Sequence, residues 1–284
     1  MSSKNEHILC ILCKDQKGIV SWVTSLLAKQ GGNILDLEQH SEEESGLFAM
    51  RLHVEDISSM KTLEQELKRK TPFQDFRFWI HSTLQKQRMA ILVSTESLCL
   101  YDLLIKQTAG ELPCSIPLIV SHRENLKPIA DHFSIPFHYL PIDPKNPQQQ
   151  EKKLDALLKK NQIDLIVLSR YMRILSKDFV ISRLGKMINI HHGFLPAFKG
   201  AKPYHQAWER GVKIIGATAH YVVEELDEGP IIHQATVEVT HRHSIQEMIR
   251  TGQDLERKVL TQAVRAHLEH RILLVGKRTW VFHF

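Results

Sequence analysis

The order of the predicted elements changes once along this 284-residue chain, and this change constrains the fold more than any other feature. Over the first 81 residues, short apolar runs and helical stripes follow one another as strand, helix, strand, strand, helix, strand. The strands are expected at residues 7–13, 34–40, 47–54 and 73–81, and the helices at 19–30 and 60–70. This order is typical of ferredoxin-like α+β domains.

After a polar stretch at residues 82–88, apolar strands alternate with helices. Strands are expected at 89–94, 116–121, 136–142, 164–169, 187–190, 217–223 and 230–239, and helices at 98–108, 125–133, 151–161 and 244–270. Such alternation predicts βαβ units and an α/β domain with a mostly parallel sheet. We therefore predict two domains, residues 1–85 and 86–284, with the ligand site of the second beyond the carboxyl ends of its strands.

Charge and cysteine content limit the compartment and the partners. Thirty-seven Lys and Arg residues against 32 Asp and Glu give a net charge of +5, which suits a small anionic molecule. The Lys152-Lys153 and Lys159-Lys160 pairs are too sparse for a nucleic-acid surface, so we expect no nucleic-acid partner. Four cysteines, a polar N-terminus and no long apolar run predict a cytoplasmic protein without a membrane span.

A polar cluster follows the strand expected at residues 187–190. Alternation along that strand places Asn189 and His191 on the same face, at its carboxyl end. An amide donor beside a titratable imidazole is a pair suited to holding a developing oxyanion. Ordinary capping of the turn after the strand is the alternative explanation.

A second cluster is an acidic loop that follows His220 and precedes Gly229-Pro230. It contains Glu224, Glu225, Asp227 and Glu228. Four carboxylates so close together repel one another unless one of them is used in a site or all are solvated. The solvated acidic turn remains the alternative.

Metal and redox chemistry are both predicted to be absent. His191 and His192 are adjacent on a strand and point in opposite directions, while His241 and His243 have no acidic or Cys partner at zinc-like spacing. The Cys10-Ile-Leu-Cys13 motif lies inside a predicted strand, whereas redox motifs of this kind sit at a helix N-terminus. A core role for Cys10 and Cys13 is therefore expected.

Several motifs resemble those of known families. The sequences Asn189-Ile-His191, Leu195-Pro196, Leu226-Asp227 and Gly229-Pro230 are similar to the formyltransferases that use formyltetrahydrofolate, and the runs 170–175 and 216–234 resemble the deformylase group within them. Residues 15–20 and 32–34 resemble an ACT domain, a small amino-acid-sensing module. The resemblance covers nearly the whole chain and implies an ACT domain followed by a formyltransferase-like domain.

The resemblance implies hydrolysis of 10-formyltetrahydrofolate to tetrahydrofolate and formate, with no cofactor. This reaction balances the one-carbon pool and supplies formate for purine synthesis. By the same resemblance, Asn189 binds the formyl oxygen, cationic His191 stabilises the tetrahedral oxyanion, and Asp227 orients the attacking water and assists its proton loss. His220 ties down the acidic loop.

The resemblance also implies a folate pocket. Its expected apolar and polar walls are Met172, Arg173, Ile174 and Leu175, with the backbone of Val223, Glu224 and Glu225 along the pterin edge.

Four positions depart from the deformylase pattern, and two other functions compete. Thr95, Leu98, His122 and Gly193 stand where a Lys, a His, an Asn and a Ser are usual. A formyltransferase with an amine acceptor is one alternative, although residues 94–97 lack the glycines of a phosphate-binding loop. A non-catalytic amino-acid sensor is the other, and formate release distinguishes it from a hydrolase.

The N-terminal domain is predicted to be regulatory. ACT domains pair and bind a small amino acid at the shared interface, so the resemblance implies a site there. The turn from Asp15 to Gly18 leads into a helix N-terminus, whose free amides suit a carboxylate, and Asn33 could meet the ammonium group of the same ligand. The resemblance implies glycine or methionine as effector and a homodimer or homotetramer. A purely structural dimerisation domain is the alternative.

Overall fold

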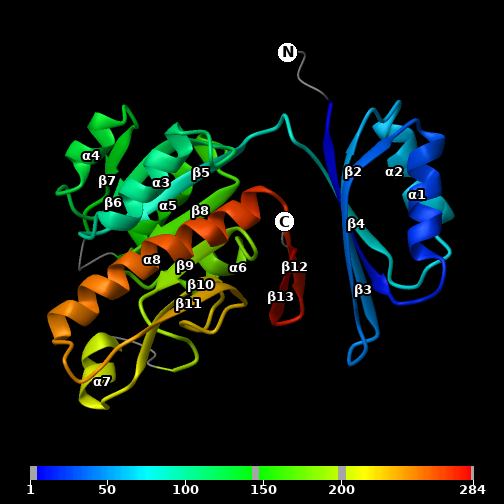
Figure 1. Ribbon diagram of the computed structural model, residues 1–284. Coiled ribbons are helices and arrows are strands. Elements are labelled where there is room, and N and C mark those ends of the chain that lie inside the picture. The colour runs from blue at the N-terminus through cyan, green and yellow to red at the C-terminus, as the bar shows by residue number, and fades with distance from the viewer. Residues whose placement is uncertain (1–4, 143–146, 198–202, 283–284) are drawn as a thin grey trace. The chain divides into compact units, whose positions relative to one another are not determined.

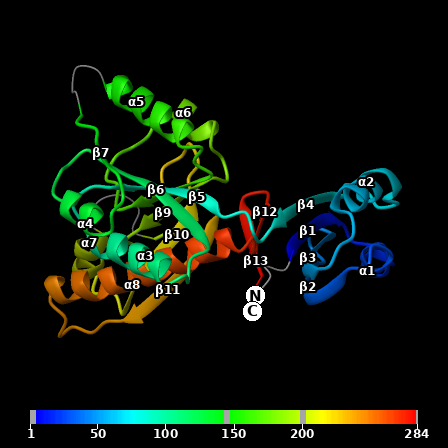
Figure 2. The same ribbon diagram turned by 90° about the horizontal axis from the view of Figure 1, so that it is seen from above.

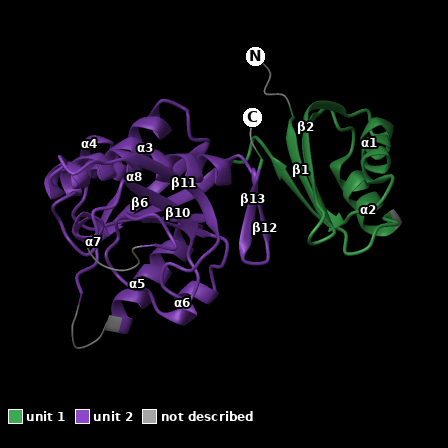
Figure 3. Ribbon diagram, turned by 60° about the horizontal axis from the view of Figure 1, so that its bottom comes forward, with its two compact units in different colours: residues 1–86, 282–284 green, residues 87–281 purple. Residues whose placement is uncertain are grey.

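The computed structural model describes residues 5–142, 147–197 and 203–282. The chain divides into two compact units, residues 1–86 with 282–284, and residues 87–281 (Figure 3). Each unit has its own hydrophobic core, and each is described by itself below.

The first unit has the predicted element order and a four-stranded antiparallel sheet in the order β2-β3-β1-β4. Its elements are β1 (His7–Lys14), α1 (Ile19–Lys29), β2 (Asn33–Glu42), β3 (Leu47–Glu55), α2 (Met60–Lys70) and β4 (Arg77–Ser82). Both helices cover one face of the sheet (Figure 1), where side chains such as Leu9, Leu27 and Leu63 form the core. The expected ferredoxin-like fold is confirmed.

The last strand of this unit is shorter than predicted, since β4 begins at Arg77 rather than at residue 73. Phe73 and Phe76 instead pack edge-on against Trp22, with ring centroids 5.4 and 5.7 Å away. This aromatic cluster closes the core in a loop, which an apolar run alone does not distinguish from a strand.

The second unit is built on a seven-stranded sheet in the order β11-β10-β9-β8-β5-β6-β7. Its first half contains β5 (Gln87–Val93), α3 (Leu98–Thr108), β6 (Cys114–Ser121), α4 (Lys127–His132), β7 (Phe137–Tyr139), α5 (Pro147–Lys160) and β8 (Leu165–Ser169). Its second half contains α6 (Lys177–Ile181), β9 (Met187–His191), α7 (Pro203–Glu209), β10 (Ile214–Tyr221), β11 (Ile231–Glu238), α8 (Ile245–Leu268), β12 (Ile272–Val275) and β13 (Arg278–Val281).

The predicted, mostly parallel sheet is confirmed. Strands β7, β6, β5, β8 and β9 pair in parallel, and β10 runs antiparallel to β9 and β11 on either side of it. The strand order reverses between β5 and β8, because the chain builds outward from β5 on one side and from β8 on the other. Such a switch point opens a crevice at the carboxyl ends of the strands.

Helices cover both faces of this sheet (Figure 2). Helices α3 and α8 bury Val167, Ile188 and Ile190 on one face, while α5 and α6 bury Leu168 and Met187 on the other. Because side chains alternate along a strand, β9 sends Asn189 and His191 toward the α5 and α6 side.

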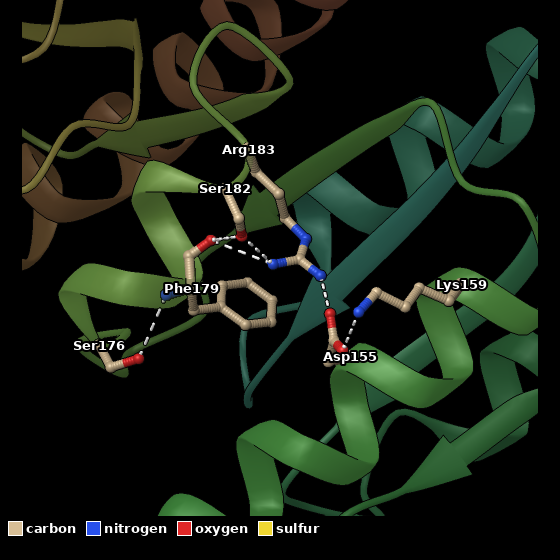
Figure 4. A network of polar contacts seen from close by, with 6 residues as sticks. All are labelled: Asp155, Lys159, Ser176, Phe179, Ser182 and Arg183. Atoms are coloured by element: carbon tan, nitrogen blue, oxygen red, sulfur yellow. Dashed lines mark hydrogen bonds and ion pairs between the residues drawn. The ribbon is translucent and has the colours of Figure 1, made fainter.

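A polar network holds α6 against α5 (Figure 4). The Asp155 carboxylate binds the guanidinium of Arg183 and, at 2.8 Å, the ammonium of Lys159. The Arg183 guanidinium also lies 3.9 Å from the centroid of the Phe179 ring and donates to the Phe179 carbonyl at 3.1 Å. These contacts fix the short helix that follows the cavity loop described below.

Four elements were not predicted, namely α6, α7, β12 and β13. Each is at most seven residues long, so none completes enough periods to stand out from a loop. The strand expected at residues 136–142 covers only Phe137–Tyr139, because the edge strand β7 pairs with β6 alone.

Candidate active site

A cavity of about 330 Å³ opens at the carboxyl ends of β8 and β9, next to the switch point. Every residue predicted to catalyse or to bind substrate lines it, namely Asn189, His191, Asp227, Met172, Arg173, Ile174, Leu175, His220, Val223, Glu224 and Glu225. Residues more than 50 positions apart in sequence therefore meet around one space large enough for part of a small organic ligand.

Asn189 and His220 are brought together by strand pairing. They lie directly opposite each other on β9 and β10, with Asn189 Nδ2 3.2 Å from His220 Nε2. His220 Nδ1 is 2.9 Å from the Tyr221 carbonyl oxygen, which can only accept, so Nδ1 carries a proton. Nε2 therefore lies beside the Asn189 amide and, 3.7 Å away, a carboxylate oxygen of Asp227, so His220 links these two side chains.

Asp227 comes from the acidic loop and pairs with two histidines. It adopts a left-handed backbone with φ 57°, and its side chain is 7% exposed. One carboxylate oxygen lies 3.2 Å from His191 Nδ1 and the other 3.7 Å from His220 Nε2. The hypothesis of a fully solvated acidic turn is therefore wrong for Asp227, whereas Glu224 pairs with Lys177 at the rim.

Opposing effects set the ionisation of Asp227. Burial raises the pKa of its carboxyl, but interactions with His191 and His220 lower it more, and the net pKa is well below the ordinary value. Asp227 is therefore a carboxylate throughout the physiological pH range. The Asp227 carboxylate, 3.2 Å from His191 Nδ1, orients this ring within the cavity.

The acidic loop is closed by a tight return to β10. Tyr221 donates its N–H to the Pro230 carbonyl at 2.9 Å. A Cβ at Gly229 would collide with the carbonyl oxygen of Tyr221, so only glycine permits this approach. The Gly229-Pro230 motif thus determines where Asp227 lies.

The backbone after His191 is held by Thr218, its partner in register on β10. The Thr218 hydroxyl donates to the Gly193 carbonyl at 2.9 Å and accepts the Leu195 N–H at 3.1 Å. Gln234 donates to the Leu195 carbonyl and to the Thr218 hydroxyl, both at 2.9 Å. This buried network gives the catalytic strand a rigid end.

The cavity walls on the α6 side are largely apolar. Met172 and Ile174 are 58% and 78% exposed, which is unusual for such side chains, while the lining residues Leu175 and Val222 are half-buried and Val180 is buried. The Met172 N–H donates to the Ser94 hydroxyl at 3.0 Å, which anchors the loop to β5. An exposed apolar rim over an apolar floor suits a flat heteroaromatic ligand.

None of the four departures from the expected pattern lines this cavity. Thr95 and His122 line a neighbouring open depression with Arg123 and Arg173, and burial followed by those two arginines lowers the pKa of His122. Leu98 is exposed at the start of α3. Gly193, the fourth, presents its carbonyl to Thr218 and not to the cavity.

Within a single chain, the predicted regulatory residues lie at opposite ends of the sheet, so a site that includes all of them needs a second copy of the chain, as predicted for a shared interface. Asp15 and Gly18 follow β1 at the end of the sheet where Lys14 pairs with Leu47, whereas Asn33 pairs with Glu55 at the other end of β3. Nine residues of β3 separate the two ends by about 25 Å. The Asn33 amide also donates to the Glu55 carboxylate at 3.1 Å.

Gly18 itself has the predicted geometry. It precedes α1 with φ 93°, and no side chain caps the helix there, so the first amides of α1 have no side-chain acceptor.

The Cys10–Cys13 motif lies inside the buried strand β1. Among the described residues, no group of three His, Cys, Asp or Glu side chains is placed to hold a metal ion. The predicted core role of the Cys10–Cys13 motif is confirmed, since both thiols are buried inside β1. Burial raises the pKa of Cys10 to about 12 and that of Cys13 to about 11.

Two family models match the chain, an ACT domain over residues 7–70 and a formyl transferase over residues 87–264. The formyltetrahydrofolate deformylase of Synechocystis is 48% identical over 96% of this chain and 97% of its own length. The chain belongs to the formyltetrahydrofolate deformylase family. A crystal structure of a deformylase from Pseudomonas syringae superposes with a TM-score of 0.93, at 41% identity, over 99% of this chain and 96% of that one.

This deformylase family shares its second unit with transferases. Glycinamide ribonucleotide transformylase 1 of Symbiobacterium toebii superposes with a TM-score of 0.65 at 27% identity, over 75% of this chain and 98% of that one. No helix in the described parts of the chain is long and apolar enough to span a membrane.

Sequence reasoning missed two polar residues of the deformylase cavity, Arg170 and His192. Arg170 was noticed only as the first residue of a motif, and His192 only as a rejected metal ligand. One sequence signal pointed to this part of the cavity. Glu256 is a charged residue on the buried face of α8, and a buried carboxylate requires a partner of opposite charge.

Proposed function

We propose that this protein hydrolyses 10-formyltetrahydrofolate to tetrahydrofolate and formate. The observation that carries the proposal is the meeting of Asn189, His191 and Asp227 at one edge of an apolar cavity. The full-length similarity to formyltetrahydrofolate deformylases supports the same substrate.

The three side chains divide the chemistry between them. The Asn189 amide donates to the formyl oxygen, and His191, paired with Asp227 at 3.2 Å, stabilises the negative charge that develops on this oxygen. The ionised Asp227 orients a water and accepts its proton as the water oxygen adds to the formyl carbon. That proton passes to N10 as the carbon–nitrogen bond breaks.

The pterin is proposed to bind between the loop 172–175 and the segment 223–225. The apolar side chains of Met172, Ile174 and Leu175 cover its faces, and the backbone of residues 223–225 bonds its polar edge.

Direct measurement of formate tests the proposal. Purified protein is incubated with 10-formyltetrahydrofolate, and formate and tetrahydrofolate are quantified separately. Equal release of both supports hydrolysis. No formate would support the sensor hypothesis, and formyl transfer to an added amine without formate would support a transferase.

Transfer to an amine is the second candidate, because the second unit superposes on a glycinamide ribonucleotide transformylase. The segment that follows β5, residues 94–97, contains Glu96 and no glycine, and Glu96 accepts a hydrogen bond from Gln253 at 3.0 Å. An acid there disfavours a phosphorylated acceptor. Water is thus the better acceptor.

The reaction is proposed to need neither a metal nor an organic cofactor, because Asn189, His191 and Asp227 together provide the donors and the base. Formate release that persists after dialysis against a chelator supports this proposal. A loss that added metal restores contradicts it. We place this activity in the cytoplasm, where it supplies formate to purine synthesis.

For the ACT domain, we propose that glycine or methionine binds between two copies of the chain. β2 is an edge strand, so two copies can pair along it about a two-fold axis. Within one chain, β2 ends at the same end of the sheet as the Asp15–Gly18 turn. When two β2 strands pair antiparallel, the start of one strand, which carries Asn33, lies beside the end of the other. Asn33 of one copy then lies at the end of the sheet that carries the turn of the second copy. In a homodimer or homotetramer paired in this way, Asn33 and the Asp15–Gly18 turn come from different copies, so their separation within one chain does not exclude a shared site.

Calorimetric titration with glycine and methionine tests this assembly, together with the mass of the particle in solution. Gly18→Val places a β-branched residue at φ 93° and is expected to abolish the heat of binding while formate release persists. A monomer, or no heat and no rate change with either amino acid, would contradict the sensor role.

A further inference from the structure

Arg170 lines the catalytic cavity without any assigned part in the reaction. It follows β8 directly and has a left-handed backbone with φ 57°, a conformation that is rare for a residue other than glycine. Its side chain is only 15% exposed, and the buried atoms Nε and Nη1 have no hydrogen-bond partner among the described residues. Because Nε and Nη1 are buried, a ligand in the cavity can meet only the part of the guanidinium that remains exposed.

Arg170 is held by a buried carboxylate on α8. Its Nη1 lies 3.4 Å from Glu256 Oε2, and the Glu256 side chain is 2% exposed. The other oxygen of Glu256 accepts the Tyr204 hydroxyl at 2.7 Å, and Gly252 leaves room for this tyrosine because any Cβ there would collide with it. Three elements therefore fix one guanidinium at the cavity wall.

This pair is poorly explained as a source of stability. A buried ion pair contributes less than well-packed apolar residues of the same size, because both charges lose their hydration. The buried face of α8 around Glu256 carries Val259, Leu260 and Ala263 in the core, and its one other buried polar side chain among the described residues, Thr261, donates to Asp102. A charged pair retained there, with one member facing the cavity, indicates a functional role.

The position of Arg170 relative to the catalytic side chains suggests what it binds. The apolar walls for the folate, Leu175, Val180 and Val222, lie on the α5 and α6 side of the sheet. The Arg170–Glu256 pair lies on the α8 side, beside His192, whose pKa is lowered to about 3 by burial and by the charges of Arg170 and His191. Arg170 lines the same cavity as Asn189, His191 and Asp227, so it can meet the small anionic product that forms there while the apolar walls hold the folate proposed above.

We propose that Arg170 binds the formate carboxylate as it forms and leaves, and that Glu256 and Tyr204 position the guanidinium for this task. The inference rests on the hydrolysis proposed above. When the carbon–nitrogen bond breaks, the electron pair goes to N10 with the proton held by Asp227, and the formyl carbon leaves as formic acid. This acid loses its proton to water and remains as formate, and a planar guanidinium matches such a carboxylate.

Formate binding is measured directly and without turnover, by the broadening of the formate proton resonance when protein is added. Wild-type protein is expected to broaden this resonance, and formate is expected to inhibit turnover as a product. Arg170→Gln is expected to weaken both effects by about tenfold to a hundredfold, the scale of lost hydrogen bonds to a charged group. Arg170→Lys keeps the charge without the planar fork and is expected to restore part of the binding.

Arg257→Gln is the matched control. It makes the same chemical change one residue from Glu256, on an exposed side chain that pairs with Asp102 and Asp254 outside the cavity. This variant is expected to bind formate as the wild type does. Thermal unfolding and tetrahydrofolate binding of each variant show whether the fold and the folate pocket are intact.

Three outcomes overturn the proposal. These are wild-type protein that does not broaden the formate resonance, chloride that competes as well as formate, and Arg170→Gln that folds and binds formate unchanged. The last would make the pair purely structural. The formate resonance is measured without substrate, so this assay is independent of turnover. A protein that binds formate through Arg170 but releases no formate from 10-formyltetrahydrofolate would contradict the proposed hydrolysis and leave the proposed formate site intact.

Discussion

At the scale of single residues, the site depends on a carboxylate placed against two imidazoles. Asn189 and His191 share a face of β9, His220 lies opposite on β10, and Asp227 reaches them from a loop. The side chain of Asp227 is almost completely buried, so its charge acts in a medium that screens it poorly.

Removing the charge of Asp227 tests its catalytic role. Asp227→Asn is expected to lower turnover by about 10² to 10⁴, because the amide cannot accept the proton of water. Glu228→Gln, the same change at the next residue of the loop and outside the cavity, is expected to have little effect on turnover. Near-wild-type formate release by Asp227→Asn would contradict the mechanism.

The oxyanion donors are tested by truncation. Asn189→Ala is expected to reduce turnover by about 10² or more, the usual effect of one lost donor. His191→Ala is expected to be at least as damaging, since it removes a positive charge as well as a donor. Variants that lose binding of 10-formyltetrahydrofolate but keep the rate at saturation would assign these residues to binding instead.

Asp227 also links stability to pH. The folded state lowers the pKa of this carboxyl, so its ionised form stabilises the fold above the unfolded value of about 4, and this contribution is lost as pH falls toward the folded value. Wild-type protein should therefore lose more stability than Asp227→Asn between about pH 6 and about pH 3, measured by denaturant unfolding. Equal losses in the two proteins would show that the carboxyl is not stabilised by its histidine partners.

At the scale of elements, the connection from β10 to β11 positions the catalytic carboxylate. Its return passes through Gly229, where no side chain fits beside the Tyr221 carbonyl. The loop therefore cannot shift without moving Asp227 relative to β9.

Gly229→Ala tests this constraint. The added methyl group pushes the loop away, and turnover is expected to fall by about tenfold to a hundredfold, as for catalytic groups misplaced by about 1 Å. Gly110→Ala is the control, because no atom lies within 4 Å of the added carbon there and only the positive φ is strained. Equal activity of the two variants would show that the loop adapts without moving Asp227.

At the scale of the whole molecule, the candidate active site and the candidate amino-acid site belong to different units of the chain. The cavity is formed entirely by residues of the second unit, and the Asp15–Gly18 turn belongs to the first. Residues 83–86, which connect them, are exposed and lie outside any helix or strand. Few backbone hydrogen bonds protect such a segment from proteases.

Limited trypsin digestion is expected to cut at Lys86 and to leave a fragment that begins at Gln87, identified by N-terminal sequencing. This fragment is expected to release formate at a rate that glycine and methionine do not change, because the residues that line the cavity all belong to the second unit. A fragment that is folded but inactive would show that catalysis depends on the ACT domain.

The sequence by itself determined the two folds, because periodicity reports which face of an element is buried. It also determined Asn189 and His191 as a pair, since side chains two apart on a strand share a face. The assignment of Asp227 and of the folate walls came instead from the resemblance of their motifs, and the structure places all of them around one cavity.

Only the tertiary structure decided the rest. Local periodicity does not show which residues lie at the same end of a sheet, so only the structure reveals that β3 separates Asp15 from Asn33 within one chain. The partnership of Arg170, Tyr204 and Glu256 spans three elements, and an ion pair between residues 86 positions apart leaves no periodic trace. Long-range contacts of this kind arise when the sheet and α8 pack, and the chemistry of the α8 side of the cavity depends on them.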